Sequence, residues 1–249
     1  MPEPTPATTT AGHGLPEHLD PSELGTKEHW ESAYARETQN FLENPSDEGI
    51  IWFSESCAEE RMIQYLSSLP LSASSASFLD VGTGNGHLLF ELREADEDEE
   101  YAGLMVGIDY APASVDLART IARQRGLDVR FETVDVIQDE LMGQHWVPPG
   151  GFDVVLDKGT FDAISLSEEM LSDGRRVVEA YPAKVAAAMR KGGWLVVTSC
   201  NWTEEELGRR IVEGAAGELQ VYGRVKYPSF TFGGVAGQTV CTLCFRRRE

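Results

Sequence analysis

The chain has 249 residues, of which 41% are hydrophobic and 9% aromatic. This composition can bury one substantial core, and a single domain of about 200 to 250 residues is an ordinary size. The formal net charge of -20, from 41 acidic and 21 basic residues, disfavours a nucleic-acid partner because phosphates would be repelled over most of the surface. A basic protein is a better-matched partner, although the same charge also serves solubility alone.

The same sequence disfavours a membrane span, a signal or transit peptide and a disulfide-bonded fold. No apolar run approaches the roughly 18 residues of a membrane span, and the first residues carry neither a basic nor an apolar region. The four cysteines are too few and too scattered for a disulfide framework, which fits a reducing compartment. We therefore expect a soluble cytoplasmic monomer without a membrane partner.

The first elements predicted along the chain are helical. Residues 1–25 are rich in Pro, Thr and Gly and are expected to form a disordered tail. An amphipathic helix follows, and a second one is expected at about residues 57–69. The stripe along the first helix consists of Trp30, Tyr34, Glu37 and Phe41. We expect these aromatic side chains to pack beneath a helical lead-in to one domain that covers residues 26–249.

Short apolar strands then alternate with helical segments, which indicates a doubly wound α/β fold with a mostly parallel sheet and helices on both faces. The expected strands are 77–81, 104–109, 129–134, 152–156 and 194–199. The expected helices lie near 87–94, 112–125 and 175–189. Near the end of the chain, the β-rich runs "ELQVYGRVKYPSFTFGG" and "QTVCTLCFRRR" predict a closing antiparallel hairpin. Within it, Cys241 and Cys244 are expected to point to opposite faces as core packing and to form no metal site.

A glycine-rich turn directly follows the first expected strand. Gly82, Gly84 and Gly86 in "LDVGTGNG" let a backbone approach a ligand closely beyond the carboxyl end of the sheet. Asp109 ends the second expected strand, where a carboxylate can hold ribose hydroxyls. The spacing is G-x-G-x-G, and it differs from the G-x-G-x-x-G that cradles a dinucleotide pyrophosphate. The pattern therefore favours another nucleoside cofactor over a nicotinamide dinucleotide.

The motifs, in this order, resemble those of the seven-stranded, Rossmann-like methyltransferases that depend on S-adenosylmethionine. "LDVGTGNG", "GIDYAP", "ETVDVI" and "DVVLDKGTFDAISL" are similar to their first four motifs. A narrower resemblance adds "HWESAYARETQNF", "GIIWFSES", "SCNWTEEEL" and "FTFGG", which are similar to strings in the lysine methyltransferases of translation elongation factor 1-alpha. The resemblance implies S-adenosylmethionine as cofactor and a basic protein, this factor, as substrate. The alternatives are a small-molecule methyltransferase and a non-catalytic S-adenosylmethionine-binding protein on the same fold.

The resemblance also implies a cofactor site. The implied residues are Asp80, Gly82, Thr83, Gly84, Asn85, Gly86, Asp109, Tyr110, Asp135, Val136 and Asp157. In this scheme, Asp109 binds the ribose, Tyr110 lies against the adenine, and Asp135 accepts from the adenine amino group. Asp80 orients the glycine loop, although a carboxylate at a strand end that caps the following turn is an equally good interpretation. Trp52 and Phe53 are candidates to cover the cofactor.

The reacting end is expected where the fourth and fifth strands end. Asp157 and Phe161 are the candidates for a lysine channel, with Asn201 and Trp202 opposite them, because a carboxylate can steer an ammonium and an aromatic face can hold it at about 0.5 to 2 kcal/mol. Lys158 would repel a substrate lysine, and we expect it to point away and pair with an acid.

Overall fold

The computed structural model describes residues 17–95, 101–228, 230–232, 235–237 and 239–249. A seven-stranded sheet has the order β3-β2-β1-β4-β5-β9-β6, and β7 and β8 form a separate pair. The strands are β1 (Phe78–Val81), β2 (Met105–Asp109), β3 (Arg130–Thr133), β4 (Phe152–Lys158), β5 (Met189–Ser199), β6 (Leu219–Val225), β7 (Phe230–Phe232), β8 (Val235–Gly237) and β9 (Cys241–Arg247). Neighbours from β3 to β5 pair in parallel, whereas β9 is antiparallel to β5 and β6. The predicted Rossmann-like sheet and its closing antiparallel hairpin are confirmed.

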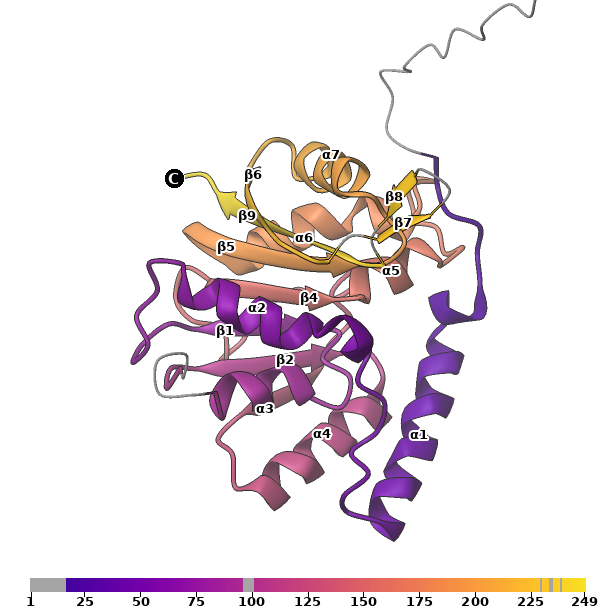
Figure 1. Ribbon diagram of the computed structural model, residues 1–249, viewed down its shortest axis with the longest axis vertical. Coiled ribbons are helices and arrows are strands. Elements are labelled where there is room, and N and C mark those ends of the chain that lie inside the picture. Colours follow the sequence, from indigo (N-terminus) through magenta and orange to yellow (C-terminus); the bar gives the residue numbers. More distant parts are fainter. Residues whose placement is uncertain (1–16, 96–100, 229, 233–234, 238) are drawn as a thin grey trace, which may run out of the picture.

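Helices cover both faces of this sheet (Figure 1). The helices are α1 (Lys27–Glu43), α2 (Ala58–Ser67), α3 (His87–Arg93), α4 (Pro112–Arg125), α5 (Thr160–Ser165), α6 (Tyr181–Ala188) and α7 (Glu204–Gly214), with short 3-10 turns η1 (Glu23–Gly25), η2 (Ser54–Ser56) and η3 (Val177–Glu179). One core cluster joins the sheet to α2, α3 and α4, and a second joins it to α5, α6 and α7. The ligand-binding edge of such a sheet is the carboxyl end of its parallel strands.

Burial on both faces explains why the central strands are almost wholly apolar. Every residue of β1 and β2 is buried, as expected for parallel strands between two helical layers. Successive side chains enter different cores, because Leu79 packs towards α6 and Phe78 towards α2. The same alternation places Cys241 and Cys244 in the two different clusters. Their predicted role as core packing is confirmed.

Local signals account for where several helices begin and end. Pro112 starts α4, and Gly126, with φ of 71°, ends it, so the predicted helix at 112–125 is confirmed. The expected helix at 175–189 is instead divided into η3 and α6. Pro182 lies in the first turn of α6 and lacks the N–H that would continue a helix from the preceding turn. Both α5 and α7 were missing from the expected elements, although Thr203 and Glu206 form a capping box at the start of α7.

The N-terminal segment reaches the carboxyl edge of the sheet. Figure 1 shows α1 standing beyond the ends of the parallel strands, and it packs beside α4. Residues 17–25, here called the N-terminal strap, are tied to the domain by hydrogen bonds. Arg210 donates to the Glu17 carbonyl at 2.8 Å, Arg176 to the Leu19 carbonyl at 2.9 Å, and the Ser22 N–H to the Leu166 carbonyl at 3.1 Å. The predicted tail therefore differs from the structure at residues 17–25, and its residues 1–16 lie outside the described part of the chain.

Candidate active site

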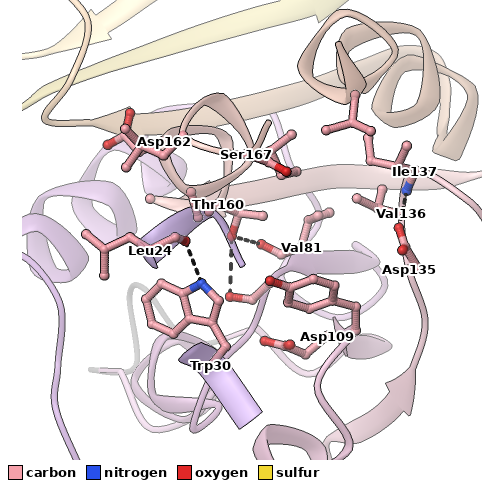
Figure 2. A pocket seen from close by; sticks show the side chains of 18 of the residues that line it. Leu24, Trp30, Val81, Asp109, Asp135, Val136, Ile137, Thr160, Asp162 and Ser167 are labelled. Atoms are coloured by element: carbon pink, nitrogen blue, oxygen red, sulfur yellow. Dashed lines mark hydrogen bonds between the residues drawn. The ribbon is translucent and has the colours of Figure 1, made fainter. Parts of the chain in front are cut away.

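A pocket opens at the carboxyl ends of the parallel strands, between them and α1 (Figure 2). Its walls come from the ends of β1 and β2 and from the segments that follow β1, β2, β3, β4 and β5. The strap, α1 and the loop before η2 complete them. The lining residues include Leu24, Gly25, Trp30, Tyr34, Trp52, Phe53, Gly82, Asp109, Tyr110, Asp135, Val136, Ile137, Gln138, Gly159, Thr160, Asp162, Leu166, Ser167, Glu169, Cys200 and Asn201. This position is the one that the sequence predicts for a nucleoside ligand.

The glycine loop is shaped by close packing on both of its sides. Gly82 and Gly84 have φ of 67° and 58°, a region that favours glycine. A Cβ on Gly82 would lie 2.0 Å from the Thr160 hydroxyl oxygen, and one on Gly84 would lie 2.5 Å from the hydroxyl oxygen of Tyr34. Gly82 lines the pocket, whereas Gly84 lies behind its surface against α1. The glycines thus let neighbouring elements close around the loop.

The remaining predicted loop residues also lie behind the pocket surface. Asp80 accepts a hydrogen bond from Thr83 at 2.7 Å, and burial raises the pKa of Asp80 to about 7. The Asn85 side chain donates to the Glu48 carbonyl at 2.9 Å, and a Cβ on Gly86 would meet the ring of Phe131 at 2.8 Å. Their direct contact with a cofactor stays a prediction, and their observed role is to hold the loop that carries Gly82.

Asp109 presents a fixed carboxylate to the pocket. Its Oδ1 accepts from the Ala111 N–H at 2.9 Å, and its Oδ2 accepts from the Gly84 N–H at 3.1 Å. The side chain is buried, and burial raises the pKa of this carboxyl even though these hydrogen bonds oppose the rise. Tyr110 lines the pocket beside it. Each carboxylate oxygen retains a further acceptor position, so Asp109 can accept from ribose hydroxyls, and this role stays a prediction.

Asp135 and Val136 line the pocket after β3, as predicted for the adenine end. The Oδ1 of Asp135 is occupied by its own turn, since it accepts from the N–H groups of Ile137 at 2.8 Å and Gln138 at 3.1 Å (Figure 2). The strand-closing role that Asp commonly has is therefore present here. The second oxygen of the carboxylate can accept a hydrogen bond from a ligand.

Aromatic side chains close the pocket opposite the sheet. The Trp30 indole N–H donates to the Leu24 carbonyl at 2.8 Å, which ties α1 to the strap (Figure 2). Trp30 stacks on Tyr34 with 6.0 Å between ring centroids and meets Trp52 edge to face at 5.6 Å. Trp30 and Tyr34 thus form pocket wall in addition to the expected packing. Trp52 and Phe53 line the pocket, which agrees with their predicted covering position.

The predicted lysine channel differs from the structure at three of its four residues. Asp157 is fully buried and accepts from Tyr181, the Thr160 N–H at 2.9 Å and the Phe161 N–H at 3.0 Å. Phe161 is 1% exposed and packs between Tyr181 and Trp202 at ring-centroid distances of 5.3 and 6.3 Å. These side chains form a buried layer behind the pocket, because the strand end and the start of α5 turn them into the core.

Asn201 lines the pocket as predicted. Asp162 and Cys200 also line it, and sequence reasoning missed them. The signal for Asp162 was present, because it is the second acid of "LDKGTFDA" and faces the end of β5. Lys158 pairs with an acid as predicted, Glu59 at 3.5 Å. Its ammonium also donates to the Trp52 carbonyl at 3.1 Å and lies 5.9 Å from the centroid of the Phe53 ring.

Comparison with known proteins defines the class. A family model described as methyltransferase domain matches residues 72–229. The solved structure of the [4+2]-cyclase SpnF has a TM-score of 0.60 at 14% identity and covers 93% of this chain and 99% of its own. The N-methyltransferase NodS from Bradyrhizobium japonicum, solved with S-adenosyl-L-homocysteine, has a TM-score of 0.56 at 15% identity and covers 88% and 99%. These likenesses show the fold, and the family match shows a methyltransferase.

Curated relatives narrow the class to a family. The protein-lysine N-methyltransferase EFM4 of Saccharomyces cerevisiae is 43% identical over 237 residues, which are 93% of this chain and 97% of the relative. The EEF1A lysine methyltransferase 2 of Homo sapiens is 36% identical over 91% of this chain and 88% of the relative. The chain belongs to this family of protein-lysine methyltransferases, whose methyl donor is S-adenosylmethionine.

The pocket fits that cofactor. A buried carboxylate, Asp109, and an aromatic ring, Tyr110, lie together at the end of β2, which are the groups that a ribose and a purine require. Among the described residues no cluster of His, Cys, Asp and Glu suits a metal ion. Within the same part of the chain, helices are too short or too polar to cross a membrane.

Proposed function

We propose that the protein transfers a methyl group from S-adenosylmethionine to a lysine side chain of translation elongation factor 1-alpha. The observation that carries this proposal is identity of 34 to 36% over 91 to 98% of the chain with three vertebrate relatives named EEF1A lysine methyltransferase 2. The formal net charge of -20 suits a basic protein partner by charge complementarity. A substrate of the translation machinery places the proposed reaction in the cytoplasm.

The pocket residues fall into two groups, one that would bind the nucleoside of the cofactor and one at the reacting end. Asp109 would hold the ribose hydroxyls, Tyr110 and Val136 would flank the adenine, and Gly82 would admit the amino-acid portion of the cofactor. S-adenosylmethionine, when bound, supplies an electrophilic methyl group. Asn201, after β5, would contact the incoming lysine. The buried layer of Asp157, Phe161 and Trp202 would hold α5 and the segment after β5 in place behind this end.

Alignment is the main demand on the protein. A lysine with an ordinary pKa near 10.4 costs about 4 to 5 kcal/mol to deprotonate at pH 7. Holding two reactants in attack geometry can supply about 7 to 11 kcal/mol, so alignment exceeds the cost of deprotonation. A desolvated pocket also lowers the pKa of an entering amine. A rigid pocket therefore suffices without a strong dedicated base.

The direct test is methyl transfer to the recombinant elongation factor. Purified protein, the factor and isotope-labelled S-adenosylmethionine should yield a labelled peptide whose modified lysine is located by mass spectrometry. The Asp109→Ala variant is the control, and it should lose labelling together with cofactor binding in calorimetry. A wild-type protein that binds the cofactor and leaves the factor unlabelled would overturn the proposed substrate.

The two alternatives have separate outcomes in the same assay. A small-molecule methyltransferase would label free amine metabolites while the factor stays unlabelled. A non-catalytic binding protein would bind S-adenosylmethionine in calorimetry and label nothing in a cell extract.

A further inference from the structure

Acidic side chains occupy both ends of the pocket, and they differ in their surroundings. Asp109 and Asp135 follow β2 and β3 at the nucleoside end. Glu169 belongs to the same side, because its charge raises the pKa of Tyr110. Asp162, on α5, lies instead beside the end of β5, next to Cys200 and Asn201. Among the described lining residues it is therefore the carboxylate at the reacting end.

The Asp162 carboxylate is fixed by the strand end that faces it. Its Oδ1 accepts from the Ser199 hydroxyl at 2.5 Å, and its Oδ2 accepts from the Cys200 N–H at 2.7 Å. The Ser199 hydroxyl oxygen in turn accepts from the N–H groups of Asn201 and Trp202, each at 3.2 Å. Each carboxylate oxygen can accept a second hydrogen bond. The group is thus oriented against β5 while acceptor capacity remains for a ligand.

Asp162 is 5% exposed, and no cation of the described residues forms an ion pair with it. Lys158 pairs with Glu59 at 3.5 Å, and Arg176 donates to the carbonyls of Leu19, Ser165 and Ser167. Burial raises the pKa of the Asp162 carboxyl, against the effect of its hydrogen bonds. A buried carboxylate without a counter-ion is costly, and a cation brought by a ligand relieves that cost.

The surroundings of Asp162 favour one kind of cation. Trp52 and Phe53 line the same pocket, and Trp52 is 37% exposed. The Lys158 ammonium lies 5.9 Å from the centroid of the Phe53 ring, so one ring of this wall already faces a cation. Aromatic rings attract an ammonium through their faces and accommodate an apolar stem. A primary ammonium on a long aliphatic chain, the side chain of lysine, meets both requirements. A metal ion would instead need several oxygen ligands at once.

We propose that Asp162, and not Asp157, is the carboxylate that receives the ammonium group of the substrate lysine at the reacting end of the pocket. The inference rests on the proposed function, because it takes the acceptor to be a lysine. The carboxylate of Asp162 accepts a hydrogen bond from the ammonium and holds its nitrogen beside Asn201. Asp157 acts one layer behind, where it fixes the start of α5 through the N–H groups of Thr160 and Phe161.

The test uses two adenosyl ligands and no protein substrate. S-adenosylhomocysteine carries no charge at its sulfur, whereas sinefungin carries an ammonium group where the transferable methyl would stand. Calorimetry should show that the wild-type protein binds sinefungin about tenfold more tightly, which corresponds to about 1.4 kcal/mol for a hydrogen bond to a charged group. Asp162→Asn should remove this preference and leave the affinity for S-adenosylhomocysteine within about twofold.

Asparagine is the closest isostere that removes the charge, and its oxygen can still accept from the Cys200 N–H. The matched control is Glu169→Gln, which removes one charge from the same pocket and should keep the preference. Equal losses of both ligands in Asp162→Asn would mean a structural role alone and would overturn the proposal. A wild-type protein without the preference would overturn it as well, even if the variant failed to fold. Failure of labelling in the elongation-factor assay leaves these affinities untouched and counts against the substrate only.

Discussion

Tyr181 donates a hydrogen bond to Asp157 in the layer directly behind the pocket, and both side chains are completely buried. The bond spans two elements, because Tyr181 starts α6 and Asp157 lies near the end of β4. Removing the hydroxyl leaves a buried carboxyl group with one hydrogen bond fewer. Hydrogen bonds to charged groups are worth about 1.5 to 3 kcal/mol. We expect Tyr181→Phe to lower the free energy of unfolding by this amount in urea denaturation at pH 8, which is above the pKa of about 7 that burial gives the Asp157 carboxyl.

The control for this variant is Tyr222→Phe, because Tyr222 is 51% exposed on β6. It should change the free energy of unfolding by less than about 0.5 kcal/mol. Similar losses in both variants would show that the buried hydrogen bond is not what stabilises this layer.

Two buried carboxyls predict how stability depends on pH. Burial raises the pKa of both Asp80 and Asp157 to about 7 in the folded chain, whereas an aspartate in the unfolded chain titrates near 3.9. Between about pH 4 and 7 the folded state therefore binds more protons than the unfolded state. The stabilisation is complete below about pH 4 and is lost as the pH rises to about 7.

The urea midpoint of the cofactor-free protein should consequently be lower at pH 7.5 than at pH 5. Asp157→Asn cannot titrate, so its midpoint should vary less over this interval. Lowered pKa values are found for Asp153, Glu206 and Glu218. The stability that these carboxylates contribute is lost only as the pH falls below about 4, so it does not affect the interval from pH 5 to 7.5. A wild-type midpoint that rises between pH 5 and 7.5 would contradict the assignment.

The contact between Gly84 and Tyr34 joins the glycine loop to α1. Gly84→Ala places a Cβ 2.5 Å from the Tyr34 hydroxyl oxygen at a residue with φ of 58°. The backbone conformation alone costs about 1 to 2 kcal/mol for a residue with a side chain, and the close contact adds to this cost. Tyr34→Phe removes the hydroxyl, so Gly84→Ala should cost less in that background.

This pair is measured as a double-mutant cycle in urea, with cofactor affinity recorded for each variant. A non-additive recovery in the double variant is expected because the two residues are in contact. Purely additive losses would show that α1 shifts to accommodate the new Cβ whether or not the Tyr34 hydroxyl is present.

The sequence predicted the sheet well, because parallel strands buried on both faces leave continuous apolar runs such as that of β1. Asp109 was placed on the pocket because it ends a strand, and the family resemblance placed Asp135 and Asn201, which lie two residues beyond β3 and β5. The orientation of Asp157 and Phe161 was not predictable, because α5 is six residues long and lacks a repeating apolar pattern. Which acid of "LDKGTFDA" faces the pocket depends on the Tyr181 and Ser199 contacts, which join residues far apart in the chain.

The strap was missed for a similar reason. Its residues are mostly polar, and residues 1–25 as a whole are rich in Pro, Thr and Gly, which predicts disorder when the segment is considered alone. Arg176 and Arg210 nevertheless satisfy its carbonyl groups from elements more than 150 residues away. Hydrogen bonds from distant arginines leave no periodic pattern in the segment that receives them.

Arg176 predicts a link between the strap and cofactor affinity. Its guanidinium donates to the carbonyls of Leu19 in the strap, Ser165 at the end of α5 and Ser167 just beyond α5. Leu24, Gly25 and Ser167 all line the pocket. Arg176→Met keeps the apolar stem and removes these hydrogen bonds. We expect the affinity for S-adenosylmethionine to fall about tenfold, the equivalent of one hydrogen bond to a charged group.

The neighbouring Arg175 supplies the matched control, because it is exposed and pairs with Asp173. Arg175→Met removes the same charge one residue away and should leave the calorimetric affinity unchanged. Equal weakening by both variants would trace the effect to the lost positive charge, since Arg176 bonds to the strap and Arg175 pairs with Asp173. A selective loss in Arg176→Met would mean that the strap closes the pocket over the cofactor through hydrogen bonds to its backbone carbonyls.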